Sequence, residues 1–254
     1  MQRVSPWAND SVAPLQAAGA LVPLVQTERG VIFDRQFHGT AFFISDAGLF
    51  LTAGHVVDQF PNEWPPLTLL ILNVHGLTAM RVAWVTRHPT VDVALGLAVI
   101  EEGQRAMPSP LALSTQRLTA GRHVAILGYP QTVTQHTIGD DGDALSRLRF
   151  TPDFYEGNIL EHHPTGVSLA KWPTYSTDIS PPPPLKDFSG ISGGPLVATD
   201  SLHVHGVASS TSETYALCTD VETVLDWDVF EHDVAGCLTV RQFEKRYPGV
   251  VRVV

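Results

Sequence analysis

The sequence predicts an all-β fold, and several features of it support that prediction. Its 254 residues include 20 Gly and 19 Pro, more than long helices tolerate but suited to short strands joined by turns. Runs rich in Val, Ile, Leu, Phe and Thr recur between Gly, Pro, Asn or Asp residues. Several runs are continuously apolar, which favours strands curled into closed barrels with both faces partly covered. Helical and strand patterns do not alternate, so a doubly wound parallel sheet is disfavoured.

The expected strands are short and are spread over most of the chain. They cover residues 22–27, 39–45, 49–53, 67–72, 80–86, 93–99, 123–127, 157–160, 195–197 and 203–208. Near the end, Thr239-Val-Arg-Gln242 has the spacing of a capping box, in which each of the two side chains hydrogen-bonds the other residue's backbone. We therefore expect a helix over residues 239–247, ended by Pro248-Gly249.

The chain is expected to be a single domain made of two lobes. The strand pattern weakens over residues 101–117, where proline and polar residues interrupt it. This stretch would connect an N-terminal lobe, roughly residues 20–110, to a C-terminal lobe, roughly residues 118–235. Residues 236–254 would add the closing helix and a tail.

The composition argues against several functional classes. Hydrophobic residues make up 44% of the chain and charged residues 17%, which excludes a disordered acidic chain. The net charge is −10 and no basic run is present, which argues against binding to nucleic acid and to anionic membrane surfaces. No apolar stretch approaches the ~20 residues needed to span a bilayer.

The cysteines and the N-terminal residues bear on cellular location. Two cysteines, Cys218 and Cys237, are too few for a disulfide-stapled secreted fold. A secretory signal has a basic start and an uninterrupted apolar stretch, whereas residues 1–22 hold one Arg and an apolar run broken by Pro14 and Gln16. We therefore expect a cytoplasmic protein.

Three short segments hold the residue types of nucleophilic catalysis. His55 lies in Leu-Thr-Ala-Gly-His-Val-Val, Asp92 in Thr-Val-Asp-Val-Ala-Leu, and Ser192 in Phe-Ser-Gly-Ile-Ser-Gly-Gly-Pro-Leu-Val. A serine hydroxyl needs a base to take its proton as it attacks, and imidazole is suited to that task at neutral pH. A buried carboxylate then fixes the imidazole tautomer and stabilises the imidazolium. Ser192, His55 and Asp92 would fill these roles in turn.

Each segment has a structural explanation when it is taken alone. His55 is then better explained as a core histidine, Asp92 as a strand-end carboxylate, and the segment around Ser192 less readily as a glycine-rich hairpin. The serine segment also fits the nucleophile elbow of α/β-hydrolases, which requires a following helix and an acid and histidine later in the chain. Here a strand pattern follows and both partners precede the serine, so we reject that alternative.

Together, in the order His, Asp, Ser, the three segments resemble the chymotrypsin/trypsin-like serine peptidases, particularly the bacterial members without disulfides. The resemblance extends from about residue 39 to about residue 211. It implies two six-stranded antiparallel β-barrels with the active site in the cleft between them. His55 and Asp92 would come from the first barrel and Ser192 from the second.

The resemblance also implies an activity and an oxyanion hole. The protein would be a serine endopeptidase that hydrolyses peptide bonds through an acyl-enzyme, without a cofactor. The developing oxyanion needs two backbone N–H groups aimed at one point, and the family pattern assigns these to Gly190 and Ser192. The other glycines, Gly193 and Gly194, would allow close packing behind the nucleophile.

One departure from the family pattern concerns activation. Secreted trypsin-like zymogens usually carry Asp just before the nucleophile, where it pairs with a newly formed N-terminus, but this chain has Ile191 there. Isoleucine cannot pair with a cationic terminus, so we expect no activation by N-terminal processing. Control would then come from ordering of the loop at residues 178–189 or from a regulatory protein partner.

Substrate-binding residues are expected around the specificity pocket. The family's pocket-base position is occupied by Lys186, which would favour an acidic substrate side chain unless it points to solvent or pairs with Asp187. The remaining pocket residues would be Ser189, Ser209, Ser210 and Thr211. The alternative to an enzyme is a catalytically silent module that holds a partner peptide in the same cleft.

The histidines and an acidic loop raise the question of a metal site. His203 and His205 share a strand face, whereas the adjacent His162 and His163 diverge. A zinc site needs three or four convergent ligands, and no such set is apparent. The Gly-Asp-Asp-Gly-Asp segment at residues 139–143 lacks the spacing of a calcium loop. We expect no metal.

Overall fold

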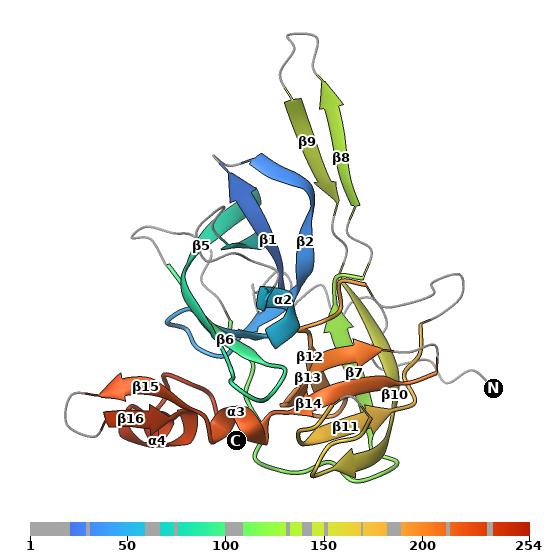
Figure 1. Cartoon of the computed structure of the whole chain (residues 1–254), viewed down its shortest axis with the longest axis vertical. Helices are drawn as coiled ribbons and strands as arrows, with labels where there is room; N and C mark the ends of the chain where they lie inside the picture. The colour runs from blue at the N-terminus through green and yellow to red at the C-terminus, as the bar shows by residue number, and fades with distance from the viewer. Residues whose placement is uncertain are drawn as a thin grey trace.

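Strands dominate the chain, and they close into two barrels. The computed structural model describes residues 21–28, 31–58, 67–73, 76–99, 109–130, 133–138, 144–149, 152–168, 170–181, 189–211, 214–232 and 236–254. Two closed six-stranded antiparallel barrels pack against each other (Figure 1). This confirms the predicted double-barrel fold.

The first barrel closes by pairing its first strand with its fourth. Its strand order is β1 (Leu21–Glu28), β2 (Val31–Phe43), β3 (Leu49–Thr52), β6 (Ala94–Ala98), β5 (Gly76–Arg87) and β4 (Leu67–Asn73), which returns to β1. Apolar side chains fill the interior, among them the fully buried Phe43, Phe50 and Leu69. Phe43 and Phe50 meet edge to face, with ring centroids 6.4 Å apart.

The second barrel repeats the arrangement with different strand lengths. Its order is β10 (Asp153–His163), β11 (Thr174–Thr177), β14 (Ala216–Asp220), β13 (Val204–Thr211), β12 (Pro195–Ala198) and β7 (His123–Gly128), which returns to β10. Its interior includes the buried Ile126, Tyr175 and Leu196. Strands 153–163 and 204–211 run beyond their predicted ends, because strand pairing extends into polar residues.

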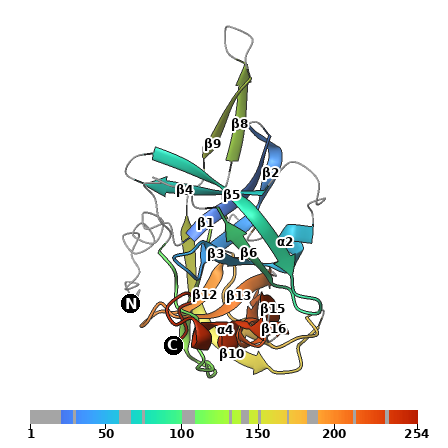
Figure 2. The same cartoon turned by 90° about the vertical axis from the view of Figure 1, so that its left-hand side faces the viewer.

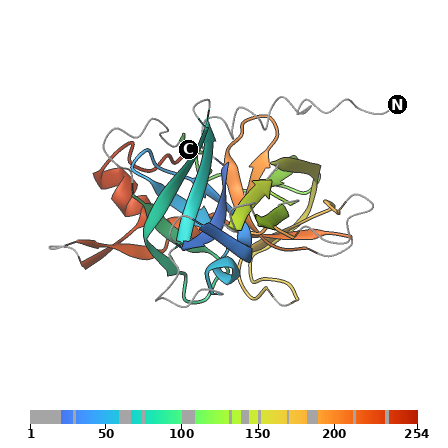
Figure 3. The same cartoon turned by 90° about the horizontal axis from the view of Figure 1, so that it is seen from above.

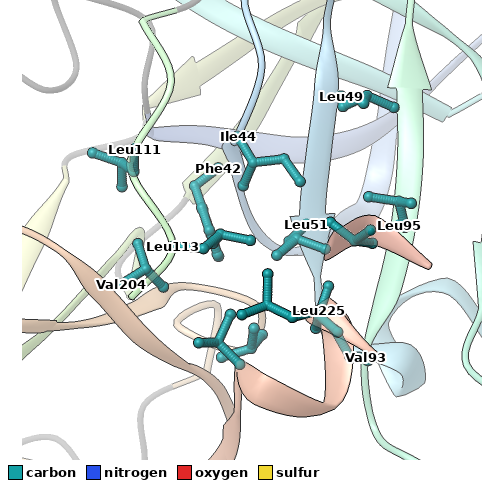
Figure 4. Packing of buried hydrophobic residues seen from close by; sticks show 14 of the residues in the cluster. Phe42, Ile44, Leu49, Leu51, Val93, Leu95, Leu111, Leu113, Val204 and Leu225 are labelled. Atoms are coloured by element: carbon teal, nitrogen blue, oxygen red, sulfur yellow. The ribbon is translucent and has the colours of Figure 1, made fainter. Parts of the chain in front are cut away.

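A third apolar cluster lies between the barrels and joins them. Phe42, Leu51 and Leu95 come from the first barrel, and Val204 comes from the second (Figure 4). Leu113 of the connecting segment and Leu225 of α3 (Glu222–Leu225) pack into the same cluster. This cluster buries side chains from both barrels and from the segment between them, so it fixes the two barrels against each other.

Two hairpins lie outside the barrels, and the sequence pattern did not predict them. Strands β8 (Val133–Ile138) and β9 (Ala144–Arg149) pair only with each other and project along the long axis of the molecule (Figures 1 and 2). Their sequences, VTQHTI and ALSRLR, contain no continuous apolar run. The β11 and β14 strands were missed for a similar reason, since TYST is mostly polar and ALCTD is mixed.

The second hairpin separates the last barrel strand from the C-terminal helix. Strands β15 (Asp228–His232) and β16 (Gly236–Thr239) form their own two-stranded sheet and lie together with the helix at one side of the molecule (Figure 3). The second barrel therefore ends at Asp220, before the lobe boundary of about 235 expected from the sequence. In the described ranges, no helix has the length and apolar character to cross a bilayer.

The C-terminal helix forms where its capping box predicted. Helix α4 covers Val240–Arg246, and the Thr239 side chain accepts a hydrogen bond from Gln242 N at 3.1 Å. In return, Gln242 Oε1 accepts from Thr239 N at 3.0 Å. Lys245 and Arg246 lie in the last turn, where cations interact favourably with the helix dipole.

Thr239→Ala should lower the free energy of unfolding by about 1 kcal/mol, since it removes the side-chain acceptor of the first helical turn. Chemical denaturation followed by circular dichroism measures this change. Thr239→Ser keeps the acceptor and should stay close to the native value. Equal stability of the Ala variant and the native protein would contradict the role of this cap.

Candidate active site

His55 is positioned at the start of a short helix that follows the first barrel's third strand. It is the second residue of α2 (Gly54–Asp58). A Cβ atom at Gly54 would lie 3.0 Å from Asp92 Oδ1 and 3.2 Å from Val93 N. The absence of a side chain at residue 54 therefore lets the helix lie directly against the turn that carries Asp92.

Asp92 binds His55 at two points. Its Oδ2 lies 2.8 Å from His55 Nδ1, and its Oδ1 accepts a hydrogen bond from His55 N at 2.7 Å. Asp92 is only 6% exposed, whereas the His55 side chain is 40% exposed. The carboxylate thus fixes the ring, with Nδ1 as the donor, and leaves Nε2 as the basic nitrogen on a ring that a substrate can reach.

The loop carrying Ser192 is held by hydrogen bonds to both barrels. Thr40 N donates to the Ser192 carbonyl at 2.8 Å, and Thr40 Oγ1 donates to the Gly190 carbonyl at 2.7 Å. From the second barrel, the Ala208 carbonyl accepts from Gly193 N at 2.8 Å. Two glycines of the loop have left-handed backbones, with φ of +96° at Gly190 and +85° at Gly193, a conformation that favours glycine.

The serine loop lies directly against the segment that leads into His55. A Cβ atom at Gly193 would lie 2.2 Å from Thr52 Oγ1 and 2.9 Å from Ala53 N. On the other side, a Cβ atom at Gly39 would lie 2.6 Å from the Ser192 carbonyl oxygen and 2.9 Å from Val56 Cγ2. These approaches bring the predicted residues His55, Asp92 and Ser192 to one place at the junction of the barrels.

Two backbone amides of the serine loop are left without an acceptor in the part of the chain that the structure describes. Neither Gly190 N nor Ser192 N donates a hydrogen bond to a described residue. Ser192 is half-buried, and its hydroxyl makes no hydrogen bond to any described residue, His55 included. The Ser192 hydroxyl and these two N–H groups therefore have no bonding partner among the described residues, on a loop that lies against the segment leading into His55.

The predicted specificity residues fall into three groups. Lys186 and its neighbour Asp187 lie outside the described residues, as does the acidic segment 139–143, which lacks the spacing of a calcium loop. Ser209 is buried, with its hydroxyl 2.6 Å from Thr219 Oγ1, so its side chain is committed to the barrel. Ser189 and Ser210 are exposed, and Thr211 pairs with Ala216 across the end of β13 and β14.

The residue before the serine faces the barrel interior. Ile191 is 1% exposed and packs in the core of the second barrel, where a Cβ atom at Gly128 would lie 2.6 Å from its Cγ1. Its side chain thus anchors the serine loop by apolar contact, in place of a charged pair.

Sequence reasoning missed Thr40, which makes two hydrogen bonds to the serine loop. Besides its bonds to the loop, Thr40 Oγ1 accepts from Tyr129 N at 3.1 Å and the Thr40 carbonyl accepts from Thr52 Oγ1 at 2.8 Å. The only signal was its place after Gly39 in a predicted strand. A threonine inside an apolar strand does not reveal which partners it bonds.

Several other described histidines are bonded to protein groups. His162 Nε2 lies 2.8 Å from Asp220 Oδ2, His163 Nε2 lies 3.0 Å from Ser176 Oγ, and His205 Nδ1 lies 2.9 Å from the Gln116 carbonyl. Burial raises the pKa of Asp220 and lowers that of His205. Across the described ranges, no three His, Cys, Asp or Glu side chains gather as metal ligands.

Thr40→Val should lower the free energy of unfolding by about 1–3 kcal/mol, because it leaves the buried N–H of Tyr129 without its hydroxyl acceptor and the Gly190 carbonyl without its donor. Thermal or urea unfolding measures the change. Thr40→Ser, which keeps the hydroxyl, is the matched control and should retain most of the stability. A Val variant as stable as the Ser variant would refute the proposed role of the hydroxyl.

Comparison with known proteins supports the same fold. The MamO protease domain from Magnetospirillum magneticum in its apo form is similar over 82% of this chain and 95% of its own, with 13% identity and a TM-score of 0.54. Deg5 is similar over 85% and 91%, with 20% identity and a TM-score of 0.54. Kallikrein-related peptidase 10 is similar over 84% and 94%, with 15% identity and a TM-score of 0.55.

At these identities the structural likeness shows the fold alone, and no protein with a curated description matches the sequence. The family comparison goes further. The model of the trypsin-like peptidase domain matches residues 39–207, more than half of the chain, and this segment holds both barrels' contributions to the candidate site. The chain therefore belongs to the trypsin-like peptidase domain family.

Proposed function

We propose that the protein is a serine endopeptidase that hydrolyses peptide bonds through an acyl-enzyme on Ser192. One observation carries the proposal: the Asp92 carboxylate binds both the ring and the backbone of His55 beside a serine loop with two amides that no described residue accepts from. This arrangement offers a base, a nucleophile and an oxyanion site together, as acyl transfer requires.

In the proposed reaction, Ser192 Oγ attacks the substrate carbonyl while His55 Nε2 takes the hydroxyl proton. The negative charge that forms on the carbonyl oxygen is stabilised by the amides of Gly190 and Ser192. Asp92 holds the imidazolium in place and stays ionised. His55 then gives the proton to the leaving amine, and a water molecule, activated by the same base, hydrolyses the acyl-enzyme.

The end of β13 is the place where the substrate would bind. Ser210 is exposed there. A substrate would add as a short strand beside residues 209–211, because Val207 and Ala208 already bond neighbours on both sides. Control would come from a partner protein or from ordering of the loop before Ser192. The buried Ile191 supports this view, because it offers no charge to pair with a processed N-terminus.

A second candidate is a silent module that binds a partner peptide in the same cleft. One observation favours it: the Ser192 hydroxyl lacks a hydrogen bond to His55. Catalytic hydrogen bonds are often long in unliganded enzymes and tighten when the substrate binds. The Gly190 and Ser192 amides, which a binding module would not need to keep without an acceptor, favour the enzyme.

Labelling with a fluorophosphonate probe separates the two candidates. The native protein should form a covalent adduct on Ser192, because the probe needs the activated hydroxyl and the oxyanion site, and Ser192→Ala should not react. Asp92→Asn should lower the labelling rate by about 10⁴-fold, since it favours the wrong tautomer of His55. Mass spectrometry of the labelled peptide identifies the site.

The matched control is Asp58→Asn, which removes the exposed carboxylate that pairs with Arg87 on the same side of the barrel. This variant should label like the native protein. Absence of labelling in the native protein, with and without a cell extract that could supply an activator, would favour the silent module.

A further inference from the structure

We infer that His88 is a positioning residue that holds Asp92 against His55, and that its protonation releases this hold in acid. The inference rests on the proposed function for its kinetic consequences. It concerns a histidine that lies outside the catalytic machinery, at the point where β5 ends and the Asp92 turn begins.

The turn that carries Asp92 is closed by His88 through both its backbone and its ring. His88 N donates to the Val93 carbonyl at 2.9 Å. The ring nitrogen Nδ1 accepts from Thr90 N at 3.2 Å and from Val91 N at 3.1 Å. The three groups that bond His88 belong to Thr90, Val91 and Val93, which flank Asp92 in the chain. We therefore expect the direction of the Asp92 carboxylate to depend on the position of the His88 ring.

The two ring bonds require neutral imidazole. Nδ1 accepts both hydrogen bonds with its lone pair, so the single ring proton must lie on Nε2. Protonation of Nδ1 would turn it into a donor that faces two other donors. Both hydrogen bonds would be lost, and the turn would be left with only its backbone closure.

The ring is held in place by a residue from the other end of the chain. The Trp227 ring lies against His88, with centroids 4.9 Å apart and an interplanar angle of 60°. Trp227 is 8% exposed and lies in the segment between α3 and β15. His88 thus cannot turn away from the two amides without disturbing a buried tryptophan.

Charged neighbours do not compensate for a proton on His88. On its own side, Arg87 pairs with Asp58, and Asp92 is bound to His55. Beside Trp227, Asp226 pairs with Arg241, and Asp228 is exposed. Partial burial of the ring disfavours its charged form, and this desolvation lowers the pKa of His88.

The direction of the pH effect follows from this lowered pKa. An unfolded chain takes up a proton at the ordinary histidine value of about 6.5, before the folded protein does. The stability contributed by neutral His88 is therefore full above that value and is lost as the pH falls toward the folded pKa. Below the folded pKa, His88 is charged and the Asp92 turn loosens.

Three variants test the role of the ring nitrogen. His88→Ala removes the acceptor and should lower kcat at pH 8 by 10-fold to about 100-fold, with KM changed less than about threefold, because misplacing a catalytic group slows chemistry more than binding. His88→Asn keeps an oxygen acceptor that can bond the same two amides and should restore most of kcat. His123→Asn changes an exposed histidine of the second barrel and should have no effect.

The pH profile separates positioning from a merely structural role. For the native protein, the logarithm of kcat/KM should fall in acid first with a slope of one and then more steeply, as His88 also takes up a proton. In His88→Asn the slope should stay at one. An equal steepening in both proteins would overturn the inference, as would an Asn variant as slow as the Ala variant.

An NMR measurement tests the positioning role of His88 without relying on catalysis, so its outcome is independent of the proposed peptidase function. In the Ser192→Ala background, the NMR signal of the His55 Nδ1 proton reports its hydrogen bond to Asp92. The signal should persist when His88 is retained and in His88→Asn, and it should weaken or exchange faster in His88→Ala. An unchanged signal in the Ala variant would refute the positioning role even if Ser192 proved not to be catalytic.

Discussion

Thr40 joins the two barrels through every polar group it has. Its N–H and its hydroxyl donate to carbonyls of the serine loop, its hydroxyl also accepts from Tyr129 N, and its carbonyl accepts from Thr52. The residue is fully buried, so these bonds are made away from water, where a missing partner is costly. Thr40 thereby links the serine loop to Thr52, at the end of the strand that leads to His55.

The glycines around Thr40 make that contact close enough. Gly39 and Gly193 leave no room for a side chain, because a Cβ atom at either would come within 3 Å of backbone atoms across the junction. Two barrels packed only through side chains would stand farther apart. Backbone contact brings the Ser192 loop to the start of α2. The apolar cluster between the barrels, shown in Figure 4, fixes the barrels relative to each other.

Residues C-terminal to the matched family region contact the first barrel and the connecting segment. The matched region ends at residue 207, yet Trp227 packs on the ring of His88 and Arg252 N donates to the Ile44 carbonyl of the first barrel. Val254 N adds a bond to the Leu113 carbonyl in the connecting segment. The C-terminal part of the chain thus contacts the first barrel directly, and one of its contacts lies at His88, where the turn that carries Asp92 begins.

The sequence by itself determined the barrel class, the order of the three chemical segments and the capped C-terminal helix, because each depends on residues close together in the chain. Apolar runs specify buried strands, and Thr239 reaches Gln242 within one helical turn. Only the tertiary structure decided that Thr40 holds the serine loop, that Ser209 turns into the barrel and that Trp227 supports His88. These contacts join residues far apart in sequence, and they form only once both barrels have closed and packed.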